Sequence, residues 1–384
     1  MESNLGSGQR SAFSTPILLT STLVALASML WSCGRNQPGG TPAKLQEAWD
    51  DYNNPLRLNG RYNFNFIGLP TQGTATTTPW SDTYWPNFLG GIAQRWYGAP
   101  SDGFSYALIA QSAATALTGP DLAQLSPAEK YDIYEGNFDY PLVTSERQRT
   151  HASDPSWYGL CHGWAPAAIN FAEPKPVTLK GPSGIAIEFG SSDVKALLTY
   201  AQQWNRGPTD VQMVGQRCNS DISGDPDAAN SAACRDVNAG AFHVILANEL
   251  GLDNAPFVAD IARDQQVWNQ PVFAYKSQIL GDVPTIYASA APGTTRIVQV
   301  KTTMYYVDES SPNWNAIPAA NFPQEISTND YQYTLELNAS GEIIGGEWSE
   351  YDRPDFVWRE TAPTLTGYLQ DIGTIYAASI ASSH

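Results

Sequence analysis

The spacing of apolar residues changes along this chain, and the change limits the folds it can adopt. In the first half, Ser126 and Glu129 form a capping box that predicts the start of a helix, and residues 192–204 carry apolar side chains at helical spacing. In the second half, segments rich in β-branched and aromatic residues predict strands at 242–246, 257–261, 296–307 and 331–337, with a turn at 338–341 leading into 342–349. Helices followed by an antiparallel sheet predict an α+β fold.

The charge of the chain argues against a nucleic-acid partner. The sequence contains 21 Lys and Arg against 38 Asp and Glu, which gives a formal net charge of −17. A protein that binds nucleic acid needs a basic surface to neutralise the phosphates. Hydrophobic residues make up 42% of the chain, enough for a large core. We therefore expect a folded domain, most simply a monomer, that binds no nucleic acid.

The N-terminus has the features of a secretory signal. Arg10 precedes a run of apolar and small residues at 12–31. The run ends in Leu-Trp-Ser-Cys, which resembles a bacterial lipobox in which Cys33 is lipidated and becomes the mature N-terminus. An ordinary cleaved signal and an uncleaved anchor are the alternatives. We expect an exported protein that is lipid-anchored in the bacterial cell envelope or secreted.

These features divide the chain into three segments. We expect a signal peptide at 1–32, a lipidated N-terminus with a flexible Gly- and Pro-rich linker at 33–55, and one folded domain at 56–384. No later hydrophobic run is long enough to cross a bilayer.

Two cysteines enclose an acidic loop. Cys218 and Cys234 are separated by residues typical of turns, and in an oxidising compartment they are expected to form a local disulfide. Closing a loop of this length contributes about 3 kcal/mol in the chain-entropy model. The loop carries Asp221, Asp225 and Asp227, which could bind Ca²⁺ or form a solvated acidic loop.

Cys161 remains as a candidate nucleophile. Pro166 is tolerated in the first turn of a helix, which predicts a helix starting just after Cys161. The positive end of the helix dipole would then favour a thiolate. A buried structural cysteine is the alternative, because free cysteines are among the most buried residues.

A thiol enzyme also needs a base, and His243 is the strongest of four histidines. His162 is the immediate neighbour of Cys161 and cannot easily reach its sulfur, while His151 and His384 lie in polar or terminal positions. If residues 243–260 form a hairpin, His243 faces Asp260, with Asp264 as the alternative carboxylate. The order Cys, His, Asp fits both papain-like proteases and transglutaminases, so the residues alone predict thiol-based acyl transfer.

Six ordered motifs between residues 79 and 358 resemble the transglutaminase-elicitor family. They are PWSDTYWPNF, LSPAEKYD, WYGLCHGWAPAAI, the CRD and GAFH segment, DQQVWNQPVFAYK, and GGEWSEYDRPDFVW. Residues 267–272 match VWNQPV, the start of a surface peptide by which the oomycete members trigger plant defences. Phe273 and Ala274 replace the Arg and Gly of that peptide.

The resemblance implies a thiol-enzyme site that is papain-like in its logic. A helix-borne cysteine would pack against an antiparallel sheet carrying the histidine and the aspartate. Cys161 would be the nucleophile, His243 the general base and Asp260 the orienting acid. The paired cysteines beside the histidine agree with the 218–234 bridge.

The reaction implied is protein-glutamine gamma-glutamyl transfer, in which a Cys thioester gives ε-(γ-glutamyl)lysine bonds between proteins bearing Gln and Lys. The chemistry requires no cofactor, although some family enzymes respond to Ca²⁺. The backbone N–H of Cys161 is the expected oxyanion donor. Trp157 and Trp164 flank the thiol as substrate-binding residues that could exclude water from the thioester, or they are core aromatics.

Two other readings remain open from the sequence. A cysteine protease or a glutamine deamidase could use the same Cys-His-Asp triad. The chain could also be a non-catalytic surface lipoprotein whose 267–276 segment is an exposed epitope.

Overall fold

A computed structural model describes residues 49–384 except 206, 208–210, 219–233, 318–325 and 382–384. The described residues belong to one compact unit, Lys44–His384. The predicted signal peptide, Cys33, the three aspartates of the acidic loop and His384 lie outside the described residues. No helix in the described part of the chain is long and apolar enough to span a membrane.

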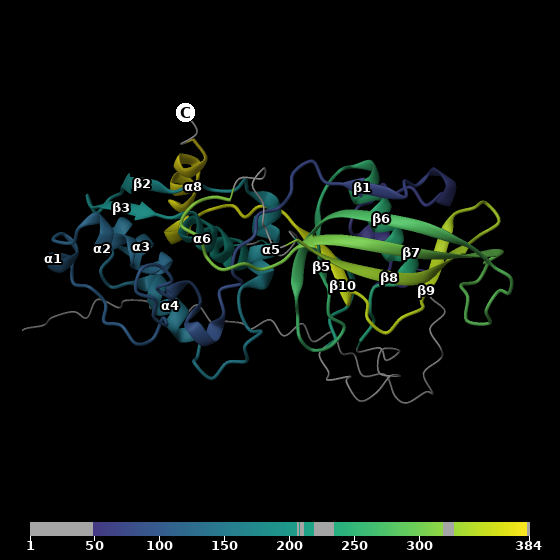
Figure 1. The fold of residues 1–384 in the computed structure, drawn as a ribbon, viewed down its shortest axis with the longest axis horizontal. Coiled ribbons are helices and arrows are strands. Elements are labelled where there is room, and N and C mark those ends of the chain that lie inside the picture. Colours follow the sequence, from purple (N-terminus) through teal and green to yellow (C-terminus); the bar gives the residue numbers. More distant parts are fainter. Residues whose placement is uncertain (1–48, 206, 208–210, 219–233, 318–325, 382–384) are drawn as a thin grey trace, which may run out of the picture. The chain divides into compact units, whose positions relative to one another are not determined.

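Most of the helices lie before residue 205, ahead of the large sheet (Figure 1). Their bounds are α1 Gln111–Ala114, α2 Gly119–Ala123, α3 Pro127–Tyr134, α4 Pro141–Arg149, α5 Cys161–Asn170, α6 Ser191–Trp204, α7 Ala239–Leu246 and α8 Ile372–Ala381. A π-helical turn, Ala247–Leu252, continues α7.

The strands form two sheets. Their bounds are β1 Gln72–Thr74, β2 Val177–Lys180, β3 Ala186–Phe189, β4 Val211–Gly215, β5 Phe257–Asp260, β6 Asn269–Val283, β7 Arg296–Val307, β8 Ile326–Leu337, β9 Ile343–Trp348 and β10 Phe356–Glu360. The large antiparallel sheet has the order β4-β10-β5-β6-β7-β8-β9, with β1 added beside β6. The strands β2 and β3 pair separately among the helices.

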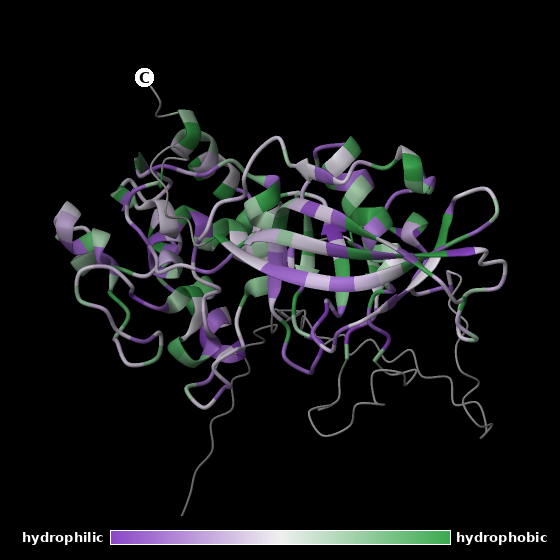
Figure 2. Cartoon of the chain, turned by 45° about the vertical axis from the view of Figure 1, so that its right-hand side comes forward, coloured by the Kyte–Doolittle hydropathy of each residue, from purple (hydrophilic) through white to green (hydrophobic). Residues whose placement is uncertain are grey.

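The two parts of the fold have separate cores. Helices α3 to α6 and α8 bury one apolar cluster, and the large sheet with α7 buries a second. Along β7 and β8 buried residues alternate with more exposed ones, and in Figure 2 hydrophilic bands mark the outer face of the long strands. Helix α5 is the element of the helical part that packs on β5 and β6. Cys161, the first residue of α5, therefore lies where the two parts meet.

Most predicted elements are confirmed. The capping box of Ser126 and Glu129 starts α3, residues 192–204 fall within α6, and β5, β7, β8 and β9 occupy the predicted segments. The mixture of helices and an antiparallel sheet is also as expected.

The prediction of a strand at 242–246 is wrong, because these residues lie in helix α7. The side chain of Asn238 accepts hydrogen bonds from the N–H groups of Gly240 and Ala241 and so caps the helix. Every residue of α7 is buried, and a continuous apolar run does not distinguish a strand from a buried helix.

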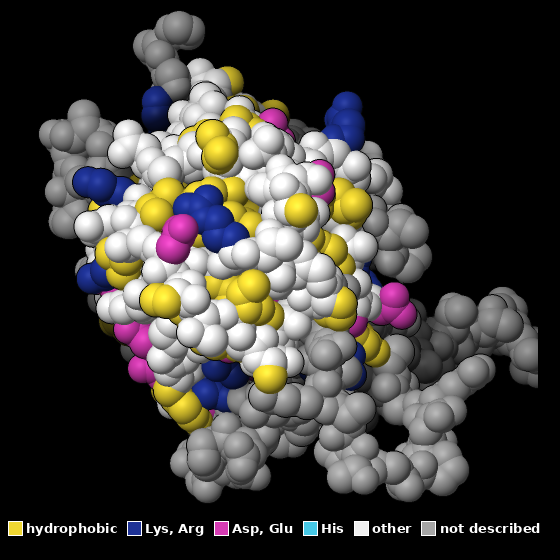
Figure 3. Space-filling model, turned by 90° about the vertical axis from the view of Figure 1, so that its right-hand side faces the viewer, with side chains coloured by type: hydrophobic (Ala, Val, Ile, Leu, Met, Phe, Trp, Pro, Cys, Tyr) yellow, Lys and Arg dark blue, Asp and Glu magenta, His cyan; other side chains and the backbone are white. Residues whose placement is uncertain are grey.

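The charge on the surface is not gathered into a basic region on the face in Figure 3. Lys and Arg side chains there are few and scattered, and hydrophobic side chains are dispersed among polar ones. This view agrees with the acidic composition of the chain.

Candidate active site

Cys161 is the first residue of helix α5, and only 6% of it is exposed. The helix starts at the cysteine itself, so Pro166 lies in the second turn rather than the first. Helix α5 approaches α6 so closely that a Cβ at Gly163 would lie 2.3 Å from the Thr199 carbonyl oxygen. This close approach explains the glycine two residues after Cys161 and holds the start of α5 against α6. The thiol thus sits at the positive end of the α5 dipole.

The start of strand β6 covers the thiol. The Cys161 Sγ lies 3.6 Å from the carbonyl oxygen of Val267 and 3.9 Å from Nδ2 of Asn269. The Asn269 amide is held from its other side, because its Oδ1 accepts a hydrogen bond of 2.8 Å from Nε1 of Trp358. This bond orients Nδ2 toward the sulfur. Asn269 is therefore a residue of the site that sequence reasoning missed.

Burial raises the pKa of the Cys161 thiol to about 11. Loss of water around the sulfur is the main cause, and the backbone N–H of Asn269 acts in the opposite direction. The negative charges of Glu309 and Asp260 add to the rise. At neutral pH the thiol is protonated, so chemistry at this sulfur requires a proton acceptor or a substrate that changes its surroundings.

Asp260 ends strand β5 and lies opposite Asn269 in the sheet. Its Oδ1 accepts hydrogen bonds from the backbone N–H groups of Trp268 and Ala262, at 2.9 and 3.2 Å. Burial raises the pKa of the Asp260 carboxyl to about 8, and these bonds oppose the rise. Asp260 is thus a deeply buried carboxyl whose charge acts on the thiol.

Glu309 follows strand β7 and also acts on the thiol. Its Oε2 accepts a 3.0 Å hydrogen bond from Nε2 of Gln270, the residue after Asn269. Burial raises the pKa of the Glu309 carboxyl. Two carboxyl groups of unusually low acidity therefore act electrostatically on the sulfur.

In the described part of the chain, His243 contacts Tyr333 rather than the thiol. His243 is buried on α7, and its Nδ1 lies 2.8 Å from the Tyr333 hydroxyl. Burial lowers the pKa of its imidazole to about 4. Among the described residues, no hydrogen bond or ring contact joins His243 to Cys161 or Asp260.

The polar chain from His243 reaches the sheet well away from the thiol. Tyr333 bonds to Thr302, and Thr302 bonds to Ser277 on β6. Ser277 is eight positions beyond Asn269, which corresponds to roughly 25 Å along a strand. The predicted hairpin pairing of residues 243 and 260 is wrong because β5 pairs with β6 and 243 is helical.

The other aromatic and histidine candidates occupy separate places. Trp164 is fully buried in the helical core, as expected of a core aromatic rather than a substrate-binding residue. Trp157 is half-buried against the same core, with its ring edge-on to Tyr158 at 4.3 Å. The His162 ring lies edge-on to Trp358 at 6.4 Å. His151 is exposed.

The VWNQPV segment is not an exposed peptide in this chain. Val267, Asn269, Gln270 and Val272 are buried, and β6 begins within the segment. Of residues 269–277, Lys276 alone is exposed. The segment lines the thiol rather than presenting a surface epitope.

The disulfide between Cys218 and Cys234 is confirmed. The backbone N–H of Cys218 donates a 2.6 Å hydrogen bond to Oδ2 of Asp355, and the backbone N–H of Asp355 donates to the carbonyl oxygen of Asp260. The bridge is therefore linked to the site by two hydrogen bonds. Within the described ranges, no group of three or more His, Cys, Asp or Glu could hold a metal ion.

The thiol is predicted to be slow to alkylate near neutral pH. We expect the rate of iodoacetamide labelling to rise with a midpoint near pH 11, because burial raises the pKa of Cys161 to about 11. Asn269→Ala should move that midpoint upward, since it removes a donor to the thiolate. Gln278→Ala, an exposed position of the same strand, is the matched control, and Cys161→Ser gives the background. A midpoint near pH 7, or one unmoved in Asn269→Ala, would contradict this account.

Stability should fall as pH rises, in part because of Asp260. Its folded pKa of about 8 exceeds the ordinary value of 3.8. The stability it contributes is complete below the unfolded pKa and is lost as pH rises through about 8. Asp260→Asn should therefore flatten the dependence of unfolding free energy on pH between pH 5 and 8, by up to about 1.4 kcal/mol per pH unit. Urea unfolding measures this, with Asp264→Asn as the control. An unchanged slope would rule out a buried, weakly acidic Asp260.

The fold and the sequence can be compared with known proteins. The crystal structure of the GP42 transglutaminase from Phytophthora sojae is similar to this chain, with a TM-score of 0.63 and 24% identity, over 84% of this chain and 95% of that chain. The similarity shows a shared mixed fold of helices and antiparallel sheet. None of the curated proteins matches. The sequence profile described as transglutaminase elicitor matches residues 143–381, which include Cys161, His243 and Asp260. The chain belongs to the transglutaminase elicitor family.

Proposed function

We propose that this chain is a protein-glutamine gamma-glutamyltransferase with Cys161 as its nucleophile. The observation that carries the proposal is the thiol at the start of α5, set against the amide of Asn269 in a chain of this family. A merely structural cysteine needs no side-chain amide held in place by a tryptophan.

The reaction would proceed in two acyl transfers. The Cys161 sulfur attacks the carbon of a glutamine carboxamide, and the thiol proton is passed to the departing nitrogen. The C–N bond breaks, ammonia leaves, and a thioester remains. A lysine amine then attacks the thioester carbon, the C–S bond breaks, and the proton lost by the amine returns to the sulfur. The product is an isopeptide bond.

Asn269 fits the stabilisation of charge in both steps. Negative charge develops on the carboxamide oxygen as the sulfur adds to the carbon, and N–H groups near the sulfur stabilise it. The backbone N–H of Cys161 at the helix start is one proposed donor, and Nδ2 of Asn269 is a second. Because Trp358 holds the Asn269 amide, that donor needs little reorganisation as charge develops.

The reaction also requires a group that accepts the thiol proton. The family resemblance assigns this role to His243, oriented by Asp260, and that assignment stays a prediction, because the described contacts attach His243 to Tyr333. Asp260 and Glu309 are carboxyl groups whose charge acts on the thiol. When ionised, either is chemically able to take the thiol proton.

Amine transfer tests the whole proposal. Wild-type protein should incorporate a fluorescent primary amine into a glutamine-bearing protein, and Cys161→Ala should abolish labelling while retaining the melting temperature. If His243 is the base, His243→Ala should lower the rate about 10²-fold to 10⁴-fold, whereas Tyr333→Phe, which removes only its hydroxyl partner, should not.

Other outcomes of the same assay assign other functions. Release of ammonia without labelling would indicate a deamidase, and cleavage of the protein would indicate a protease. Full activity of Cys161→Ala in binding or elicitation, with no labelling by wild type, would indicate a non-catalytic protein.

We also propose that the protein is exported and anchored through a lipid on Cys33. The lipobox-like sequence supports this. The N-terminal fragment of the mature protein should then carry the mass of a lipidated cysteine, and Cys33→Ala should abolish that mass. An unmodified fragment that starts elsewhere would exclude the anchor.

A further inference from the structure

We propose that a cavity beside the active site binds the acceptor protein through a basic peptide segment. The segment would place a backbone carbonyl oxygen on Arg263 and a lysine or arginine side chain near Asp264 and Asp352. This inference rests on the proposed function, because it assigns the recognition of the amine-bearing protein to a site other than the thiol.

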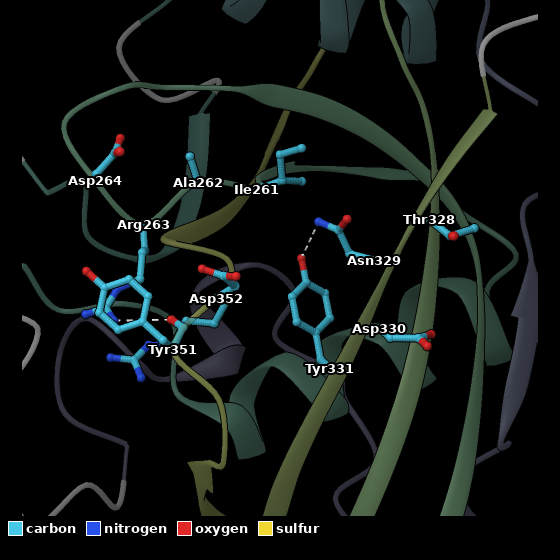
Figure 4. A pocket seen from close by; sticks show the side chains of 11 residues that line it. Ile261, Ala262, Arg263, Asp264, Thr328, Asn329, Asp330, Tyr331, Tyr351 and Asp352 are labelled. Atoms are coloured by element: carbon cyan, nitrogen blue, oxygen red, sulfur yellow. Dashed lines mark hydrogen bonds between the residues drawn. The ribbon is translucent and has the colours of Figure 1, made fainter. Parts of the chain in front are cut away.

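The cavity has a volume of about 620 Å³ and is built from three chain segments. They follow β5, open β8 and precede β10, and are residues 261–264, 328–331 and 351–353. Figure 4 shows their side chains, with Arg263 and Tyr351 stacked together and Tyr331 bonded to Asn329. Cys161 does not line this cavity, so it is distinct from the place where glutamine must react.

Arg263 is the feature that points to a ligand. It is only 5% exposed, and its guanidinium carbon lies 3.9 Å from the centre of the Tyr351 ring. Its Nη1 donates to the carbonyl oxygen of Tyr351, at 3.2 Å. Within the described part of the chain its Nη2 has no hydrogen-bond partner. A buried donor left unpaired is unfavourable, and a carbonyl oxygen in the cavity would satisfy it.

The charges around the cavity favour a cation in addition to that oxygen. Arg263 and Arg353 both face Asp236, whose Oδ2 lies 3.8 Å from Nε of Arg263 and accepts a hydrogen bond from Arg353. This buried carboxylate offsets part of their charge. Asp264 and Asp352 line the cavity, and the charge of Asp352 also acts on Arg263. Among the described residues, neither carboxylate forms an ion pair with a Lys or Arg within 4.0 Å.

The third carboxylate of the lining is already paired. Asp330 forms a 2.8 Å ion pair with Nζ of Lys301 and accepts a hydrogen bond from Thr303. Oδ1 of Asp264 accepts a hydrogen bond from the backbone N–H of Gln266, which leaves the other carboxylate oxygen for a ligand. An ammonium or guanidinium group would therefore find two carboxylates in the cavity. A peptide with a basic side chain supplies both the oxygen and the cation.

The cavity is close in the chain to the residues around the thiol. Ile261 lines it, and the backbone N–H of Ile261 donates to the carbonyl oxygen of Trp268. Trp268 lies between Val267 and Asn269, the two residues that contact the Cys161 sulfur. The connection between β5 and β6 therefore borders both the cavity and the thiol. Acceptor lysines that have a second basic residue nearby should consequently be preferred.

Peptide binding to Cys161→Ala protein tests the proposal independently of catalysis. The probe is a labelled peptide, Gly-Lys-Gly-Gly-Lys-Gly, and its affinity is measured by fluorescence anisotropy. The Asp264→Asn and Asp352→Asn double variant should weaken binding about tenfold or more, because hydrogen bonds to charged groups are lost while the side-chain shapes are kept. Asp139→Asn, an exposed carboxylate outside the cavity, is the matched control. Binding should also weaken with added salt.

Two results would overturn the proposal. One is equal affinity in the double variant and in Asp139→Asn. The other is undiminished binding of a peptide in which both lysines are replaced by glutamate, because the cavity would then select an anion. The transfer of a small fluorescent amine by wild-type protein reports separately on the proposed function. If wild-type protein fails to transfer the amine but still binds the peptide, the proposed enzyme activity is contradicted and the proposed peptide site is not.

Discussion

The amide of Asn269 is the contact on which the arrangement of the site depends. Its Oδ1 accepts a hydrogen bond from the indole N–H of Trp358, and its Nδ2 faces the Cys161 sulfur. Trp358 belongs to β10, Asn269 to β6 and Cys161 to α5, so this amide joins three elements that are far apart in the sequence. Without it the cysteine would be a buried thiol facing a carbonyl oxygen. With it, the sulfur lies beside an oriented donor.

The burial that protects this thiol also suppresses its reactivity. A sulfur that is almost fully enclosed and has two carboxyl groups acting on it holds its proton at neutral pH. Such a thiol is less readily oxidised than an exposed thiolate. A substrate that enters the site would displace the surroundings that keep the sulfur neutral. Under the proposed function, activation of the thiol would therefore accompany substrate entry.

Much of the fold could be predicted from the sequence, because its signals are local. The capping box at Ser126, the apolar spacing of α6 and the β-branched runs of β7 and β8 each depend on neighbouring residues. The disulfide was also predictable, since its cysteines enclose a short loop. Helix α7 was not, because its residues are apolar on all sides and β-branched residues occur among them.

The site was less predictable, because its contacts are made across the chain. Cys161 could be identified from its helix start and from the family motifs. Asn269 lies in a motif that suggests a surface peptide, and only the pairing of β5 with β6 reveals that it faces inward. The error at His243 followed from the assigned strand, since the hairpin that would pair it with Asp260 requires one. The burial of Trp164 could not be predicted for the same reason, because the helices that cover it come from distant parts of the sequence.

The hydrogen bond from Cys218 to Asp355 connects the disulfide to the thiol environment. The bridge at Cys218 steadies a backbone amide that Asp355 uses, and Asp355 in turn supports the strand end that bears Asp260. Without the disulfide, the backbone N–H of Cys218 would be held less firmly against Asp355. Reduction of the Cys218–Cys234 bridge would therefore act, through Asp355, on the carboxyl group of Asp260, whose charge in turn acts on the Cys161 sulfur.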